Sequence, residues 1–338
     1  GIGILLFLLS MRSMDLFAQV LPRRNPAPHI VYNDISERKL RFAACSTPNC
    51  TTVKVTELGS ETTLAPSAIT PLVLAQGNDG LPLIALIHNL YSASGPGETV
   101  RTIHCGNRLC SSGNTTAHLT TKGFFSGVSL AVGNDGHPIV AYASPYFGLP
   151  SPPGVHLVHC GNATCTSGNT DTLIAPLVRN DTSVAIGSDG LPIVVFSYVD
   201  STGPGAGNER SNLAVVHCGK HSCSSNHHTE IVVSDPVNIL DPSYTVEPAY
   251  HGMMNRIMIG NDGMPFLTYW KEYKLSPSQS RVELKGLHCG NLDCSSGNTI
   301  VSLSPLIPQI PINGFQSTGV GNDGFPVVSY HSEPLTLG

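Results

Sequence analysis

The side chains of this sequence that could act on a carbohydrate are carboxylates and aromatic rings in short irregular segments. Aromatic rings stack on sugar rings, and polar groups bind the sugar hydroxyls. Residues 270–273 place the single tryptophan of the chain, Trp270, beside Glu272 and Tyr273. Cleavage of a glycosidic bond needs two carboxyl groups about 5–10 Å apart. The candidates for such a pair, among which the spacing along the chain selects none, are Asp181, Asp200, Glu247 and Glu272.

The residues that we expect to bind a ligand open the loops that differ most between the repeated units of the chain. They are His88, Tyr91, Tyr146, Tyr198, Asp200, Trp270, Glu272, Tyr273 and His331. Packing is the alternative for the tyrosines, because we assign Tyr142, Tyr198, Tyr269 and Tyr330 to one common position at the end of the core. For Trp270, ligand stacking and core packing both stay open. No nucleophile-elbow, zinc-protease or phosphate-loop motif occurs, so no catalytic residue is assigned and the sequence favours a non-catalytic protein.

Histidines next to cysteines raise the question of a metal site. Adjacent residues of a strand point to opposite faces, so a His-Cys pair is poorly placed to chelate one ion. A recurring Asn-Asp-Gly turn offers one carboxylate, whereas calcium takes six to eight oxygens. We therefore expect no metal and no cofactor, and we expect the histidines to pack between structural units. The histidines are His104, His159, His217 and His288, and the first unit has Ala44 instead.

Two motifs recur along the chain and reveal internal repeats. The first is a turn of the form GNDGxP, which reads GSDGLP at Gly187, and the second is a short loop between two cysteines, most often CGNxxC. Their spacing of about 55 to 70 residues is typical of the blades of a β-propeller. The turns begin at Gly77, Gly133, Gly187, Gly260 and Gly321.

The ten cysteines are all used by five C-x4-C pairs. Each pair would close a short hairpin, and disulfides of this kind indicate an oxidising compartment. The expected bridges are Cys45–Cys50, Cys105–Cys110, Cys160–Cys165, Cys218–Cys223 and Cys289–Cys294.

Each unit divides into four strands rich in Val, Ile, Tyr and Phe, bounded by Gly, Pro, Asn and Asp. In one unit these strands are expected over residues 182–187, 191–198, 212–218 and 229–234. Four antiparallel strands per repeat form a propeller blade, so the sequence predicts an all-β propeller of about five blades, or six if the chain is truncated. We expect residues 28–338 to form one domain. The strand at 316–320 could complete the first blade and close the ring.

The first 27 residues are expected to lie outside this domain. Residues 1–18 contain an apolar run of signal-peptide length followed by a small residue, Ala18, and residues 19–27 would be a short linker. No later run is long enough to span a membrane. The net charge of −5 and the absence of a basic stripe give no indication of nucleic-acid binding. We therefore expect a secreted protein, extracellular or periplasmic, and the sequence indicates no oligomeric state.

The repeat resembles the units of secreted bacterial proteins that are rich in GxDGxP and HCGNxxC motifs. It resembles, more distantly, Asp-box and glycosidase-like propellers. The resemblance covers residues 28–331, and it implies a propeller fold and secretion. The chain departs from a true Asp-box, because the turn lacks the tryptophan of that motif, and no sialidase-like arginine triad can be placed. The resemblance therefore implies no activity.

The strand directions divide the loops between two faces. The GNDGxP turns and the cysteine loops would share one face, which we call the turn face. The loops after the second and fourth strands would share the opposite face, and they differ in every unit; we call this the variable-loop face. A rigid ring that presents variable loops commonly uses them to bind. We expect a non-catalytic module that binds a carbohydrate or a surface protein there. The alternative is a glycoside hydrolase or lyase with carboxylates in the central cavity.

Overall fold

The computed structural model describes residues 27–34, 36–60, 72–92, 95–120, 123, 125–144, 152–176, 181–200, 210–236, 251–276, 279–308, 316–321 and 323–330. These residues form 22 β-strands in six sheets and no helix. Within this part of the chain, nothing has the helical length and apolar character needed to cross a membrane. The predicted signal peptide, residues 1–18, lies outside the described residues.

Three sheets have the four-stranded meander that the sequence predicts, in which each strand pairs with the next. Blade 2 contains β4 (Leu72–Gln76), β5 (Pro82–Ser92), β6 (Gly95–His104) and β7 (Thr115–His118). Blade 3 contains β8 (Gly127–Val132), β9 (Pro138–Ser144), β10 (Gly154–His159) and β11 (Thr170–Ala175). Blade 4 contains β12 (Thr182–Ile186), β13 (Pro192–Asp200), β14 (Arg210–His217) and β15 (His228–Pro236).

The remaining sheets are variations on the same unit. Blade 1 has three strands, β1 (His29–Asp34), β2 (Lys39–Cys45) and β3 (Val53–Ser60). Blade 5 has β16 (His251–Ile259), β17 (Pro265–Ser276), β18 (Gln279–His288) and β19 (Thr299–Ser302), and a short β20 (Ile307–Pro308) pairs with β18. A terminal hairpin contains β21 (Gln316–Val320) and β22 (Pro326–Tyr330).

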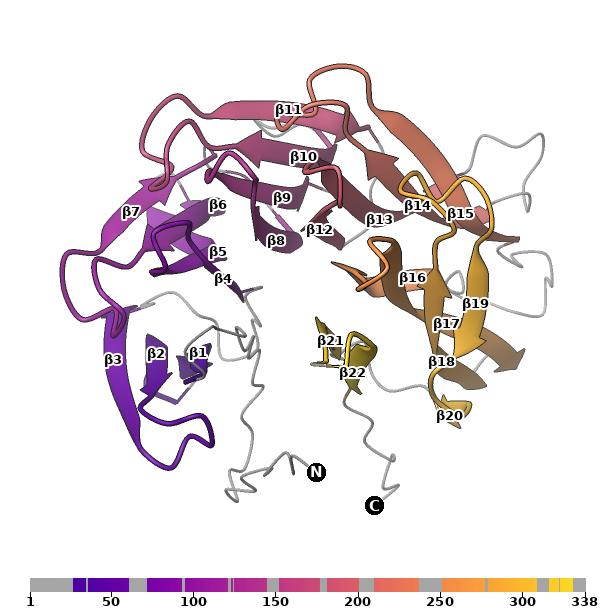
Figure 1. The fold of residues 1–338 in the computed structure, drawn as a ribbon. Helices are drawn as coiled ribbons and strands as arrows, with labels where there is room; N and C mark the ends of the chain where they lie inside the picture. The colour runs from indigo at the N-terminus through magenta and orange to yellow at the C-terminus, as the bar shows by residue number, and fades with distance from the viewer. Residues whose placement is uncertain are drawn as a thin grey trace.

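The blades follow one another around an arc, which confirms the predicted propeller (Figure 1). The first strands of the units, β4, β8, β12, β16 and β21, lie toward the centre, and β3, β7, β11, β15 and β19 lie outside. Consecutive inner strands contact each other from β4 to β21. The expected closure of the ring by strand exchange is wrong for the described residues, because β21 pairs with β22 and neither of them pairs with β1.

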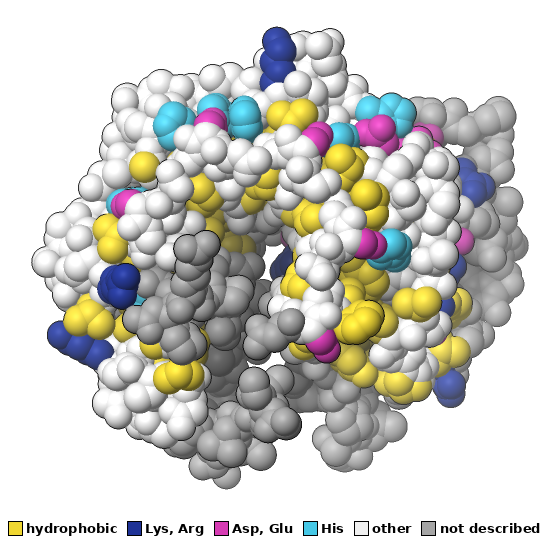
Figure 2. Space-filling model, viewed as in Figure 1, with side chains coloured by type: hydrophobic (Ala, Val, Ile, Leu, Met, Phe, Trp, Pro, Cys, Tyr) yellow, Lys and Arg dark blue, Asp and Glu magenta, His cyan; other side chains and the backbone are white. Residues whose placement is uncertain are grey.

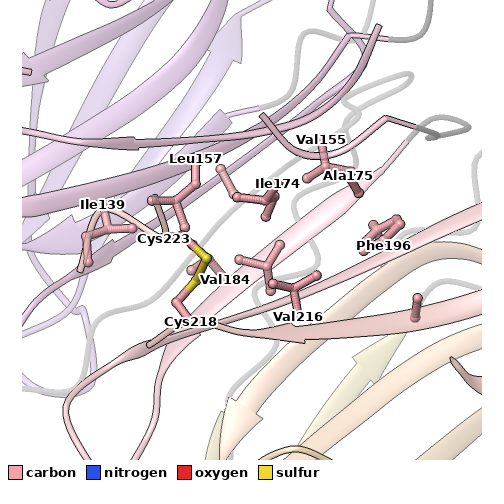
Figure 3. Packing of buried hydrophobic residues seen from close by; sticks show 13 residues of the cluster. Ile139, Val155, Leu157, Ile174, Ala175, Val184, Phe196, Val216, Cys218 and Cys223 are labelled. Atoms are coloured by element: carbon pink, nitrogen blue, oxygen red, sulfur yellow. A yellow bond between two sulfur atoms is a disulfide. The ribbon is translucent and has the colours of Figure 1, made fainter. Parts of the chain in front are cut away.

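Apolar side chains of neighbouring blades pack face to face and form the core. Between blades 3 and 4, Ile139, Leu157 and Ile174 contact Val184, Phe196 and Val216 (Figure 3). The Cys218–Cys223 bridge lies in the same cluster, with both cysteines at most 1% exposed. All five predicted disulfides are present and no described cysteine is free. The bridges therefore both close the hairpins and fill the space between blades.

The GNDGxP turns have the structural role that the sequence predicts. In the turn of blade 4, Asp189 Oδ1 accepts a hydrogen bond of 3.1 Å from the amide of Leu191. Gly190 has a φ of 87°, and a Cβ there would lie 2.3 Å from Nδ2 of Asn134 in the turn of blade 3. Two features therefore require glycine at position 190: the left-handed backbone conformation and the close approach of the neighbouring turn. The turns therefore touch from blade to blade.

Serine side chains join neighbouring inner strands along their inner edges. Ser129 Oγ on β8 accepts a hydrogen bond of 3.0 Å from the amide of Val184 on β12. Ser183 Oγ on β12 does the same for the amide of Ile257 on β16, at 3.3 Å. These bonds satisfy buried edge amides that have no strand beside them. The serine that stands four residues before the turn glycine is thus part of the scaffold.

Candidate functional site

The recurring histidine of blades 2 to 5 pairs with the turn aspartate of its own blade, which sequence reasoning missed. The four distances between His Nε2 and Asp Oδ2 are 3.0 Å for His104–Asp79, 2.7 Å for His159–Asp135, 2.9 Å for His217–Asp189 and 2.6 Å for His288–Asp262. Packing between blades, which the sequence predicts for these histidines, is therefore only part of their role. The sequence contained a signal for this pairing, because the unit that lacks the turn, blade 1, also lacks the histidine.

These pairs also establish the two faces of the molecule. Each pair joins the turn after a first strand to the residue before a cysteine loop, so turns and cysteine loops share the turn face as predicted. The inner strands consequently begin at the opposite, variable-loop face. Figure 2 shows histidine side chains beside acidic side chains at several points around the arc, and it shows that the molecule is hollowed at its centre.

Where β12 begins, blades 3, 4 and 5 meet around one ion pair. Asp181 immediately precedes β12, and its Oδ2 lies 3.0 Å from Nη1 of Arg256 on β16. The same guanidinium nitrogen donates to the carbonyl of Asn255 at 2.7 Å. On the other side, Gly127 of β8 leaves room for Asp181, because a Cβ there would lie 3.0 Å from both Cα and Oδ1 of Asp181. We call Asp181, Ser183, Asn255 and Arg256 the axial site.

The axial site is polar and largely enclosed. The side chains of Asp181 and Arg256 are 16% and 23% exposed, and Asn255 is fully buried. Burial raises the pKa of the Asp181 carboxyl above its ordinary value, although the Arg256 guanidinium and the amide of Thr182 act in the opposite direction. Burial therefore favours the neutral form of the Asp181 carboxyl, and Arg256 favours its charged form. Such a group is suited to hydrogen bonding or to proton transfer.

Arg256 is the clearest departure from the repeat. It stands four residues before the turn glycine, where β8, β12 and β21 have Ser129, Ser183 and Ser317 and β4 has Val73. The same strand contains Met258 where the other units have a small residue. Alignment of the repeats would have identified Arg256, but its partner Asp181 is 75 residues away in the chain. The sequence analysis named Asp181 as a carboxylate without placing it.

The predicted ligand-binding residues are distributed over several blades. His88 on β5 is half-buried, with its ring 6.3 Å from that of His118. Tyr198 and Asp200 lie near the end of β13, where burial and the Asp200 carboxylate raise the pKa of Tyr198. Tyr91 lies on β5, and its side chain is outside the described set. Tyr146 and His331 also lie outside the described residues.

The segment around Trp270 is buried in the described structure. Trp270 is 3% exposed and lies edge-to-face on Tyr330 of the terminal hairpin, with ring centroids 5.8 Å apart. Glu272 is 2% exposed, and Tyr273 donates a hydrogen bond of 2.9 Å to Glu283. Ligand stacking by Trp270 would require the hairpin to move away. These residues are thus not brought to the axial site as a group.

One assignment of the tyrosines is wrong in register. Tyr142 lies opposite Val128 and is fully buried, and Tyr269 is 1% exposed. The residue of blade 4 at this position is Phe196, which lies opposite Thr182. Tyr198 is two residues further along and packs on Phe196, with ring centroids 5.9 Å apart. The core position is therefore aromatic in blades 3, 4 and 5, but Tyr198 does not belong to it.

Comparison with known proteins finds structures of similar fold, with low sequence identity. No family model matches the sequence, and no curated protein matches it significantly. The polysaccharide lyase Uly1 has a TM-score of 0.49 and 8% identity, over 96% of this chain and 82% of that chain. The α-L-arabinofuranosidase Arb93A from Fusarium graminearum has a TM-score of 0.47 and 11% identity, over 85% and 93%. The α-L-arabinofuranosidase from Lactobacillus brevis has a TM-score of 0.44 and 10% identity, over 91% of each chain. With TM-scores below 0.5, these similarities carry no argument about activity.

Proposed function

We propose that this propeller binds a carbohydrate at the centre of its variable-loop face, with Asp181 and Arg256 as the central contacts. The observation that carries the proposal is the ion pair between these two residues, which three blades hold where β12 begins. The pair interrupts a scaffold whose other inner strands carry serine or valine at the position of Arg256.

The chemistry of the axial site suits a ligand with several hydroxyl groups. The Arg256 guanidinium donates in a fixed fork and the Asp181 carboxylate accepts, and both side chains are partly exposed, whereas Asn255 and Ser183 are buried and support them. Vicinal sugar hydroxyls need such neighbouring donors and acceptors. Tyr198 and Asp200 at the end of β13 stay predicted contacts from the surrounding rim. A surface-protein partner is not supported by any of these features.

Glycoside cleavage is the second candidate function, and the largely enclosed position of the Asp181 carboxyl, whose pKa burial raises above its ordinary value, favours it. A carboxyl group with a raised pKa is suited to protonating the leaving oxygen of a glycosidic bond. The reaction also requires a second carboxylate about 5–10 Å from the first. Binding is our main proposal, because it requires only the donors and the acceptor of the Asp181–Arg256 pair.

The test is a comparison of the wild type with Asp181→Asn and Arg256→Ser on soluble polysaccharides. The names of the similar structures suggest an arabinose-containing polysaccharide and a panel of further polysaccharides as probes, without supporting the proposal. We expect calorimetric titration to show binding by the wild type and at least about tenfold weaker binding by Arg256→Ser, which restores the serine of the sister repeats. Release of reducing ends or unsaturated products that disappears in Asp181→Asn would establish the second candidate.

A matched control separates this effect from loss of an ion pair in general. Arg41 and Asp34 of blade 1 lie 2.9 Å apart, with both side chains at most 20% exposed, and they are remote from the axial site. Arg41→Ser should therefore leave polysaccharide binding unchanged. Binding by none of the probes, or equal binding by the wild type and Arg256→Ser, would overturn the proposed function.

A further inference from the structure

One place on the turn face gathers several side chains that ligate metals. Asp135, His137 and His159 each offer a ligand atom, and these atoms all lie within 4.8 Å of one another. His159 Nε2 is 2.7 Å from Asp135 Oδ2, and His137 Nδ1 is 3.9 Å from the same oxygen. All three residues belong to blade 3, in the turn after β8 and at the end of β10.

A fourth side chain reaches this place from the next blade. His221 lies in the Cys218–Cys223 loop of blade 4, and its ring is stacked on that of His159 with centroids 5.8 Å apart. The Asp135 carboxylate thus lies beside the rings of His137 and His159, and the ring of His221 covers that of His159 from the next blade.

This gathering is peculiar to one pair of blades. His159 and Asp135 belong to the repeated pairs, but His137 and His221 do not. The residues that correspond to His137 are Leu81, Leu191, Met264 and Phe325, and those that correspond to His221 in the other CGNxxC loops are Arg108, Ala163 and Leu292. Two independent departures from the repeat thus converge on the same His–Asp pair. The scaffold alone requires neither of them.

Three imidazole nitrogens and one carboxylate oxygen form a common ligand set for zinc. Ligand atoms of a tetrahedral zinc ion at about 2.0–2.2 Å lie about 3.3 Å apart. The distances of 2.7 Å and 3.9 Å to Asp135 Oδ2 bracket this value, so the three ligands of blade 3 are close to chelating geometry. His221, whose ring is stacked on that of His159, would have to turn toward them to complete the set. The half-buried position of the histidines leaves the ion access from solvent.

We propose that Asp135, His137, His159 and His221 form a binding site for one Zn²⁺ ion that links blades 3 and 4 on the turn face. The sequence analysis predicted no metal site, because it tested only the adjacent histidine and cysteine of one blade as ligands. The ligands proposed here come from two blades and exclude the cysteines, which are in disulfides. The ion would replace the direct His159–Asp135 hydrogen bond by shared coordination, and it would clamp the two blades.

The experiment is a titration of Zn²⁺ alone into the non-reduced protein without a histidine tag. We expect one ion per chain, a rise in the unfolding temperature with Zn²⁺ concentration, and a Co²⁺ visible spectrum typical of tetrahedral coordination. His137→Leu and His221→Ala introduce residues of the sister repeats, so both should fold, as circular dichroism can verify. Each should weaken Zn²⁺ binding by at least about tenfold.

The matched control is His288→Leu, which removes the same kind of His–Asp pair in blade 5, where Met264 stands in place of His137. This variant should bind Zn²⁺ as the wild type does. The absence of stoichiometric Zn²⁺ binding by the wild type would overturn the site. Unchanged binding by His137→Leu and His221→Ala, or equal losses in all three variants, would overturn it as well.

Discussion

His156 shows how a single side chain in this scaffold is set by its partners. Its Nδ1 lies 3.1 Å from Asp171 Oδ1 and its Nε2 lies 2.9 Å from the carbonyl oxygen of Pro152. Tyr142 stacks on the ring and donates a hydrogen bond of 2.7 Å to Asp171 Oδ2. Both ring nitrogens thus face acceptors, an arrangement that only the protonated imidazolium can fully satisfy. Burial acts to lower the pKa of His156, but Asp171 and Pro152 raise it above its ordinary value.

A pH-dependent stability follows from this arrangement. Because the pKa is raised in the folded state, its contribution is complete below the unfolded value of about 6.5 and is lost as the pH rises through the folded value. Asp171→Asn should therefore lower the free energy of unfolding by about 1 kcal/mol at about pH 5.5, and by less at about pH 8. Urea unfolding at both pH values measures this. A larger effect at the higher pH would contradict the assignment of His156 as the proton-binding group.

The element that repeats most regularly is the inner strand, and its serines are the points where one blade holds the next. The amide of Val184 is buried and depends on Ser129 Oγ for its hydrogen bond. Arg256 replaces this serine in β16 and pairs with Asp181 instead. Regular strand spacing with one substituted position therefore gives both a scaffold and a site.

Removal of the Ser129 hydroxyl should destabilise the molecule through the amide that it leaves behind. Ser129→Ala should lower the free energy of unfolding by about 1–3 kcal/mol, because a buried donor loses its acceptor. Ser317→Ala, at the equivalent position of the terminal hairpin, should cost less than about 0.5 kcal/mol. Chemical denaturation of both variants gives the comparison, and equal effects would show that the Ser129 bond between blades contributes nothing.

Local features of the fold could be predicted from the sequence, and contacts between distant segments could not. The bridge Cys218–Cys223 and the bond from Leu191 to Asp189 join residues at most five positions apart, so the motif contains them. The strands follow from runs of apolar residues between turn residues. The Asp181–Arg256 pair joins two blades, and no local pattern encodes it. The register error at Tyr198 arose because an aromatic residue was assigned by type rather than by its distance from the turn.

At the scale of the whole molecule, apolar blade faces and five disulfides build an arc of blades in which most recurring residues are scaffold. Two places at which the copies differ are the axial site on the variable-loop face and the histidines around Asp135 on the turn face. Function in this molecule is therefore expected where the repeat is broken, on a frame that holds those places rigid.

The crystal structure of the protein with the oligosaccharide that binds most tightly in the titrations tests this account most directly. We expect ligand density at the centre of the variable-loop face, with sugar hydroxyls within hydrogen-bond distance of Arg256 and Asp181. Density over the turn face or on the outer strands, with the Asp181–Arg256 pair untouched, would contradict it.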